Sequence, residues 1–237
     1  MPRSIDEEVR QATRSQLIMG VVIGIVGLLL DFYVLSNLGD WSQGRRILGP
    51  IGLCLMAVFL TWLGVSTFRD SLRWSMNPDL HPAVCCPRFG TPQQVRQALD
   101  QVLNSPDVVR VGPILIAPDW LLLANSAAVE SVYIPTVAWC YKQVTEHKRY
   151  GVTERISYAF QLYTIDGTSF SRSGISEYDT DQLVRLTSEY APAAICGHSA
   201  ELERLWSSDR AEFLRIVAQQ HAEWERESRR HRTAANI

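Results

Sequence analysis

Two long uncharged stretches near the N-terminus decide how this chain is built: Leu17-Ile-Met-Gly-Val-Val-Ile-Gly-Ile-Val-Gly-Leu-Leu-Leu30 and Ile47-Leu-Gly-Pro-Ile-Gly-Leu-Cys-Leu-Met-Ala-Val-Phe-Leu-Thr-Trp-Leu-Gly-Val-Ser-Thr-Phe68. A helix rises about 1.5 Å per residue, so about 20 apolar residues cross a ~30 Å hydrocarbon layer. The second stretch is of this length, and the first reaches it with the following Asp31-Phe-Tyr-Val-Leu35. They predict a transmembrane two-helix hairpin, with spans at residues 17–37 and 47–68 and a short turn at 37–46.

Buried core helices and cleaved signal peptides are also apolar, but neither fits these stretches as well as a membrane hairpin does. Uncharged segments of this length are rare in soluble cores. A signal peptide needs a small-residue cleavage site after Leu30, and none follows. The chain also carries Asp6, Glu7 and Glu8 before the first stretch, where a signal peptide is basic.

Composition excludes several classes of protein. The chain has 237 residues, of which 46% are hydrophobic and 20% charged, so it is not disordered as a whole. A formal net charge of -2 gives no general attraction for nucleic acid. The mean hydropathy of -0.04 resembles that of a soluble protein only because it averages the two apolar stretches with an ordinary globular remainder. A purely soluble enzyme is therefore excluded.

Arginines near the two stretches predict the orientation of the hairpin. Loops on the cytoplasmic side carry an excess of Lys and Arg. The terminal side has Arg3, Arg10, Arg14, Arg69 and Arg73, and the connecting turn has Arg45 and Arg46. We therefore expect both termini and the soluble domain in the cytoplasm.

Two features within the first predicted span suggest a function. Gly20 and Gly24 form a G-x-x-x-G pair that allows a second helix to approach closely, although glycine is also simply frequent in membrane helices. Asp31 would mark an ion path if it lay deep in the bilayer. Near the end of the predicted span, we expect it to reach interfacial water or residues of the turn instead.

The cysteines indicate free thiols in a reducing compartment. Their number is odd and no C-x-x-C pair occurs among Cys54, Cys85, Cys86, Cys140 and Cys196. Cys85 and Cys86 lie near His81, but adjacent cysteines rarely chelate one tetrahedral zinc and no second ligand pair follows. We expect neither a metal nor a cofactor.

Three prolines within residues 77–90 mark the boundary between the hairpin (1–76) and a soluble domain (77–237). Within that domain, Asp166-Gly167 is the strongest hairpin signal. Periodicity predicts a helix at 91–104, strands at 108–112, 114–117, 120–124, 130–134, 137–147, 156–165 and 168–172, a helix at 179–190, a short strand at 194–196, and helices at 199–206 and 209–229. This order is α+β, and meandering strands closed by a C-terminal helix predict a pleckstrin-homology-like domain or a small split barrel.

Five segments carry a resemblance to a known family. They are Asn77-Pro-Asp-Leu-His-Pro82, Phe89-Gly90, Pro118-Asp-Trp-Leu-Leu122, Val137-Ala-Trp-Cys-Tyr-Lys-Gln-Val-Thr-Glu-His147 and Ala194-Ile-Cys-Gly-His-Ser-Ala-Glu-Leu-Glu-Arg-Leu-Trp206. The chain resembles an uncharacterised family of small two-pass membrane proteins with a pleckstrin-homology-like cytosolic domain, over residues 77–217. It departs from that pattern at Cys140 and His198, where an apolar residue and a tyrosine are expected. The resemblance implies a fold and a location, and no activity.

No catalytic signature stands out. His198, Ser199 and Asp209 supply the residue types of a triad, but the G-x-S-x-G elbow that presents a nucleophilic serine is missing. Trp139 and Tyr141 fit core packing better than base stacking, and no basic stripe accompanies them. We therefore expect a protein that is not an enzyme and does not bind nucleic acid.

Two basic clusters are candidate contacts with anionic lipid. The first comprises Lys142, Lys148 and Arg149, and the second Arg226, Arg229, Arg230 and Arg232. A cation near a charged leaflet adds about 1 kcal/mol to membrane binding. The alternatives are a solvated turn, whose charge Glu146 and Glu154 dilute, and a frayed solvated tail.

These patterns predict a membrane-anchored, non-enzymatic interaction or scaffold module at the cytoplasmic face, whose partners are the bilayer, an unidentified protein and anionic lipid. The alternative is an accessory subunit of a larger membrane complex, assembled through Gly20 and Gly24. A third hypothesis, an enzyme whose site the sequence does not show, also stays open.

Overall fold

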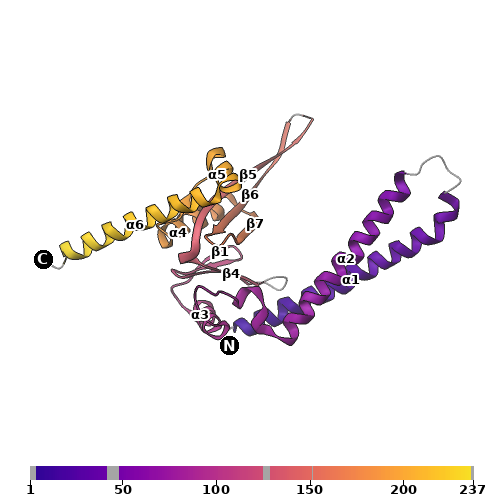
Figure 1. The fold of residues 1–237 in the computed structure, drawn as a ribbon, viewed down its shortest axis with the longest axis horizontal. Helices are drawn as coiled ribbons and strands as arrows, with labels where there is room; N and C mark the ends of the chain where they lie inside the picture. The colour runs from indigo at the N-terminus through magenta and orange to yellow at the C-terminus, as the bar shows by residue number, and fades with distance from the viewer. Residues whose placement is uncertain (1–3, 42–47, 125–128, 151, 236–237) are drawn as a thin grey trace. The chain divides into compact units, whose positions relative to one another are not determined.

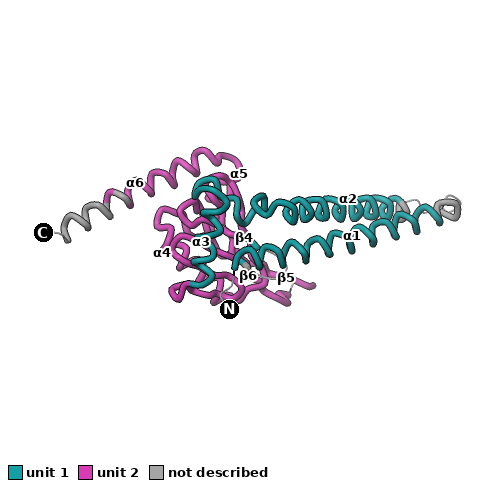
Figure 2. The backbone as a smooth tube through the Cα atoms, turned by 90° about the horizontal axis from the view of Figure 1, so that it is seen from below, with its two compact units in different colours: residues 1–104, 123–130 teal, residues 105–122, 131–237 magenta. Residues whose placement is uncertain are grey.

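The computed structural model describes residues 4–41, 48–124, 129–150 and 152–235, drawn in Figure 1. The chain forms two compact units, coloured separately in Figure 2. The first comprises residues 1–104 and 123–130, and the second residues 105–122 and 131–237. The predicted boundary at residue 77 therefore falls inside the first unit.

Two long helices begin the chain: α1 (Ile5–Trp41) and α2 (Leu48–Met76). Helix α1 has 37 residues and is therefore about 55 Å long, so it extends well beyond its predicted span. The turn predicted at 37–46 is wrong over 37–41, which are helical, and residues 42–47 lie outside the described part. The polar and glycine residues at 37–46 indicated a turn. Such propensities are weak, however, and tertiary packing often overrides them.

Small residues form the seam between α1 and α2. On α2 the buried positions are Ala57, Gly64 and Ser71, which repeat every seven residues and so stay on one face of the helix. The buried residues of α1 include Ala12, Thr13, Gly20 and Gly27. Small side chains let two backbones approach closely, which strengthens van der Waals packing where no hydrophobic driving force acts.

The glycines of this seam have no room for a side chain. A Cβ at Gly64 would lie 2.4 Å from the Gly24 nitrogen, and one at Gly20 would lie 2.8 Å from the Phe68 nitrogen. A Cβ at Gly27 would lie 2.6 Å from the Thr61 nitrogen. The helix that approaches the G-x-x-x-G pair is therefore α2 of the same chain.

Two short turns and a helix follow α2 and connect to the start of α1. They are the 3-10 turns η1 (Pro78–Leu80) and η2 (Pro82–Val84) and the helix α3 (Pro92–Asn104). Arg96 of α3 pairs with Asp6 at 3.3 Å and with Asp79 at 2.7 Å. The Ile5 nitrogen donates to Asp100 Oδ1 at 2.6 Å. These bonds explain why α3 belongs to the first unit.

The rest of the chain contains two four-stranded sheets and three helices, which confirms the α+β layout. The strand orders are β1-β2-β3-β4 and β7-β6-β5-β8. The elements are β1 (Val109–Val111), β2 (Ile114–Ile116), β3 (Trp120–Ala124), β4 (Val129–Tyr133), η3 (Ile134–Thr136), β5 (Val137–Arg149), β6 (Val152–Thr164), β7 (Ser169–Ile175), α4 (Glu177–Tyr190), β8 (Ile195–Cys196), α5 (Ala200–Ser208) and α6 (Arg210–Ala235).

The turn between β6 and β7 falls at Asp166-Gly167, as predicted. Gly167 adopts a φ of 88° and its nitrogen donates to the Thr164 carbonyl at 2.9 Å. Thr164 also donates its hydroxyl to the Asp166 carboxylate, and this bond lowers the carboxyl pKa because it stabilises the charged form. Glycine is required here because a side chain disfavours the left-handed conformation.

An aromatic cluster forms the core between β5 and the C-terminal helices. Trp139 of β5 is only 1% exposed and packs with Tyr141, Trp206 and Phe213. Its Nε1 donates to the Gly197 carbonyl at 2.8 Å, so the buried indole N–H is satisfied. The core role predicted for Trp139 and Tyr141 is confirmed.

The two glycines at the helix crossing give a matched pair of variants. G64A places a methyl group against the Gly24 backbone, whereas a Cβ at Gly24 meets nothing within 4 Å. Both variants gain the same helix propensity of about 1 kcal/mol, so this term cancels. We expect G64A to be about 1–3 kcal/mol less stable than G24A. Unfolding in mixed micelles, followed by circular dichroism, measures the difference, and equal stabilities would contradict the seam.

Candidate functional site

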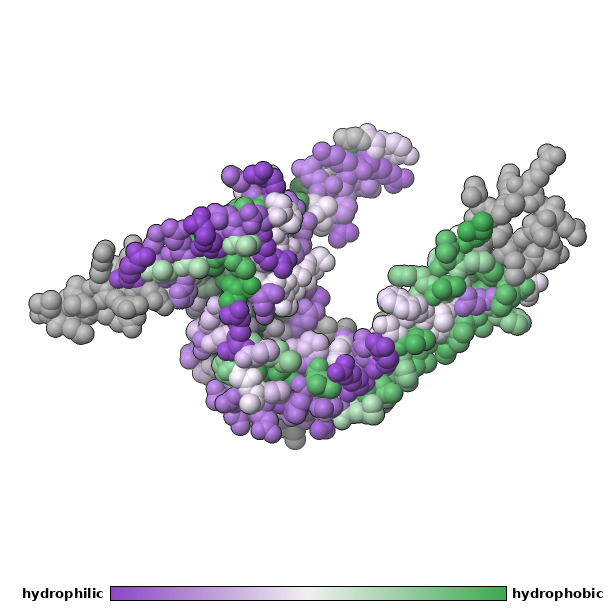
Figure 3. All heavy atoms as spheres, viewed as in Figure 1, coloured by the Kyte–Doolittle hydropathy of each residue, from purple (hydrophilic) through white to green (hydrophobic). Residues whose placement is uncertain are grey.

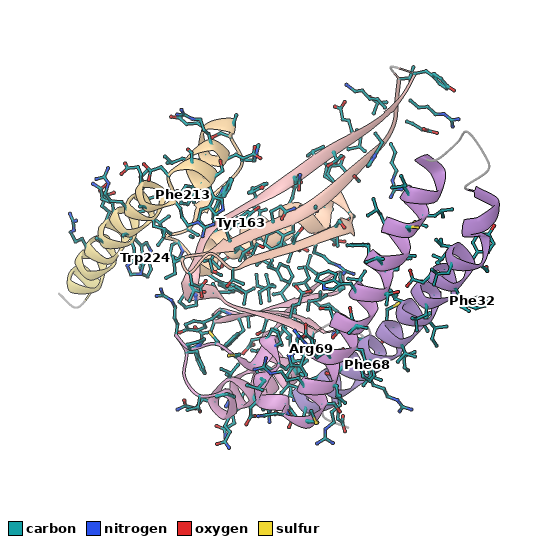
Figure 4. All side chains as sticks on the ribbon, turned by 45° about the vertical axis from the view of Figure 1, so that its right-hand side comes forward. Phe32, Phe68, Arg69, Tyr163, Phe213 and Trp224 are labelled. Atoms are coloured by element: carbon teal, nitrogen blue, oxygen red, sulfur yellow. The ribbon has the colours of Figure 1, made fainter. Side chains whose placement is uncertain are left out.

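The outer surface of the α1–α2 hairpin consists of large apolar side chains. Phe32, labelled in Figure 4, is 72% exposed, and Leu55 is 68% exposed. Figure 3 shows the hydrophobic surface that runs along both helices. The two helices are long and apolar enough to cross a membrane. Exposed large residues and buried glycines are the reverse of the pattern in a soluble core, which counts against a pair of buried core helices.

Asp31 makes a bond that the sequence did not predict. Thr61 of α2 donates its hydroxyl to Asp31 Oδ2 at 3.0 Å. Asp31 lies well before Trp41, where α1 ends, so it faces the partner helix and not the turn. This interhelical hydrogen bond joins the two helices and satisfies one oxygen of the Asp31 carboxylate.

The outer halves of β5 and β6 form a two-stranded ribbon, defined here as residues 143–157. Apart from the half-buried Ser157, its described residues are exposed, because neither β7 nor β8 pairs with the strands along most of this length. The pairing continues to Arg149↔Val152, so β5 extends beyond the strand predicted at 137–147 and β6 begins before residue 156. An isolated two-stranded ribbon is only marginally stable in water.

The tip of the ribbon combines cations with apolar side chains. Tyr150 is 94% exposed, has a φ of 51°, and lies under the Arg149 guanidinium at 5.6 Å. Lys148 pairs with Glu146 at 3.1 Å. The structure therefore places Lys148 and Arg149 together beside Tyr150 and the exposed Val152.

Lys142 lies apart from this tip. Its ammonium group pairs with Asp181 at 2.7 Å and with Glu177 at 3.2 Å, both on α4. The hydrogen bond that it donates to Asp181 has the largest effect in raising the lysine pKa, and the bond to Glu177 adds to it. Two carboxylates already compensate this charge, so Lys142 is less free than Lys148 or Arg149 to bind an anion.

The second predicted basic cluster lies on α6. Arg226 is exposed there, but the side chains of Arg229, Arg230 and Arg232 lie outside the described residues. On the same helix, just before Arg226, Trp224 (labelled in Figure 4) and His221 line a pocket of about 160 Å³ together with Pro135 and Tyr190. No local pattern of residues indicates this pocket, because its walls come from distant segments.

A pair of thiols lies at the junction of β5 and β8. Cys140 and Cys196 are parallel-strand partners, and their Sγ atoms are 3.3 Å apart. The hydrogen bond to Cys196, and then burial, raise the pKa of Cys140. The same bond lowers the pKa of Cys196, which is exposed. Cys140 is therefore the buried thiol of the pair, and Cys196 is the accessible one.

The residues considered for a catalytic triad have other partners. Ser199 Oγ accepts from the Leu202 nitrogen at 3.1 Å and so caps α5. Asp209 Oδ1 accepts from the Glu212 nitrogen at 3.1 Å at the start of α6. His198 Nε2 lies 3.2 Å from Glu203 Oε2. Each side chain stabilises a helix end or an exposed pair.

Within the described ranges, no group of three or more His, Cys, Asp or Glu side chains is placed to hold a metal ion. Comparison with known proteins gives no match to a family model, to a curated protein or to a solved structure. The family resemblance stated above therefore stays a prediction. The function has to be inferred from the geometry of the chain itself.

We expect Cys196 to react with iodoacetamide before Cys140, because the thiolate is the nucleophile and the pKa of Cys196 is lowered. In C140A the hydrogen-bond partner of Cys196 is lost, so the Cys196 pKa rises and its alkylation at neutral pH slows severalfold. C140S keeps a hydroxyl donor and is the matched control. Mass spectrometry of tryptic peptides across a pH series measures each rate. Identical rates for Cys196 in wild type and C140A would contradict this coupling.

Proposed function

We propose that this chain is a membrane-anchored, non-enzymatic interaction module. The α1–α2 hairpin spans the bilayer and the second unit acts as a docking domain at the cytoplasmic face. The observation that carries the proposal is the reversed packing of the hairpin, with small residues such as Gly64 inside and large ones such as Phe32 outside. Burying that apolar surface in lipid stabilises the protein by about 25 cal/mol per Å².

The cytoplasmic orientation is supported by the excess of arginines at the ends of the hairpin. A tethered domain meets membrane partners at a high effective concentration, so weak contacts suffice. Two four-stranded sheets with a C-terminal helix are consistent with a pleckstrin-homology-like domain. The ribbon is the surface that this domain would present, and its cationic and aromatic tip suits an anionic lipid surface.

The alternative role, an accessory subunit assembled through Gly20 and Gly24, would need a different surface. The backbone of α2 already occupies the Gly20 face, and Gly64 packs on the Gly24 backbone. A partner helix would have to bind the exposed apolar faces, for example at Leu28 or Val65.

Alkaline carbonate washing tests the anchor. We expect the full chain to stay with the membrane pellet, because the hairpin is held by the hydrocarbon layer and not by charge. An impermeant maleimide tests the orientation at the exposed Cys85. Labelling is expected only after the cells are permeabilised. Release by carbonate would overturn the anchor, and labelling of intact cells would overturn the orientation alone.

The ribbon tip gives a separate test in the full chain, reconstituted into vesicles. An environment-sensitive dye is attached through Y150C after Cys85, Cys86 and Cys196 are replaced by serine. We expect a blue shift of emission in phosphatidylglycerol vesicles relative to phosphatidylcholine vesicles. K148Q/R149Q should abolish the shift. K142Q should keep it, because Lys142 lies away from the tip and two carboxylates of α4 already compensate its charge. Equal emission in both kinds of vesicle would exclude lipid contact at the tip.

A further inference from the structure

A half-open pocket lies between the start of α1 and the end of α2. Its volume is about 390 Å³, within the range of about 300–1,000 Å³ that is usual for small-molecule sites. The lining residues are Val9, Arg10, Thr13, Arg14, Leu17, Trp74, Ser75 and Pro78. All of them belong to the first unit, and none was predicted as a ligand-binding residue.

The pocket contains two cations without a counter-charge. Arg10 and Arg14 are one helical turn apart on the same face of α1. Across the part of the chain that the structure describes, neither guanidinium has an ion pair or a hydrogen bond. Of the acidic residues about one turn before Arg10, Asp6 is paired with Arg96, and neither Asp6 nor Glu7 lines the pocket. The lining therefore carries two positive charges and no carboxylate.

A buried hydroxyl also faces this space. Thr13 is 4% exposed, and its Oγ1 has no hydrogen-bond partner among the described residues. A buried polar atom without a partner costs about 1–3 kcal/mol. A ligand oxygen in the pocket would supply that partner.

The pocket is held in place by its surroundings. Trp74 packs edge-on against His81 with ring centroids 5.0 Å apart, and His81 Nδ1 accepts from the Ala83 nitrogen at 3.2 Å. Burial lowers the pKa of His81, so the ring is neutral and adds no charge to the site. The bonds of Arg96 fix the start of α1 beside this turn.

The pocket also lies where polar and apolar sequence meet. Arg14 is the last charged residue before the uncharged part of α1. Beyond it, Leu17, Val21 and Leu28 continue the same helical stripe, and nothing lies within 4 Å of a Cβ at Gly24. The surface thus changes from cationic to apolar along one line, as a lipid molecule does from phosphate to acyl chain.

We propose that this pocket binds an anionic glycerophospholipid. Arg10 and Arg14 hold the phosphate, Thr13 donates its hydroxyl to a phosphate oxygen, and an acyl chain follows the stripe from Leu17 to Leu28. Arginine suits this role because its planar fork binds phosphate through two parallel hydrogen bonds. The inference rests on the proposed membrane anchor and adds to it a specific structural lipid.

Native mass spectrometry of the full chain in neutral detergent tests the pocket. The probes are phosphatidylglycerol and phosphatidylcholine with the same acyl chains. We expect one phosphatidylglycerol per chain, bound at least about tenfold more tightly than phosphatidylcholine because two charge-assisted contacts are added. R10Q/R14Q should lose this preference. R10K/R14K should keep only part of it, and T13V should weaken it severalfold.

A matched control separates a site from general attraction. R69Q/R73Q removes two exposed cations from the same end of the hairpin outside the pocket. This variant should bind phosphatidylglycerol as wild type does. Equal binding by R10Q/R14Q and wild type would overturn the pocket, as would competition by glycerol 3-phosphate at the same concentration. Carbonate washing of each variant shows separately whether the anchor itself fails.

Discussion

The close approach of α1 and α2 is the constraint from which the first unit is built. Gly64 packs directly on the backbone at Gly24, so neither helix can shift without a clash or a gap. Small residues at the seam leave the large apolar side chains no place inside, and they point outward. The same packing therefore holds the hairpin together and creates the surface for which a bilayer is the natural solvent.

The polar end of the hairpin follows from this geometry. Fixing the two helices brings the start of α1 beside the end of α2, and Arg96 and Asp100 of α3 then bind α1 and the following turn. The arginines of α1 thereby acquire a second role. In the sequence these arginines predict the orientation of the hairpin. In the folded chain Arg10 and Arg14 line a pocket together with Thr13, whose hydroxyl is buried.

The second unit divides its chemistry between a closed core and an open ribbon. Trp139 and its aromatic neighbours form a buried core along the inner half of β5. The outer half of the same strand pairs only with β6, because β7 and β8 do not extend along it, and Tyr150 lies at its end. One continuous strand thus contributes its inner half to the core and its outer half to the exposed ribbon.

The sequence by itself determined the hairpin, the order of strands and helices, and the β6–β7 turn, because hydrophobic periodicity, charge-free length and Asp-Gly chemistry are local properties. It could not determine the ends of α1, the partner of Asp31, the Cys140–Cys196 pair or the pocket at Arg10. Those depend on residues far apart in the chain, such as Asp31 with Thr61, that meet only after the backbone has packed. Lys142 and Lys148 looked alike in the sequence. In the structure, two carboxylates of α4 pair with Lys142, whereas Lys148 pairs with Glu146 of its own strand at an exposed tip.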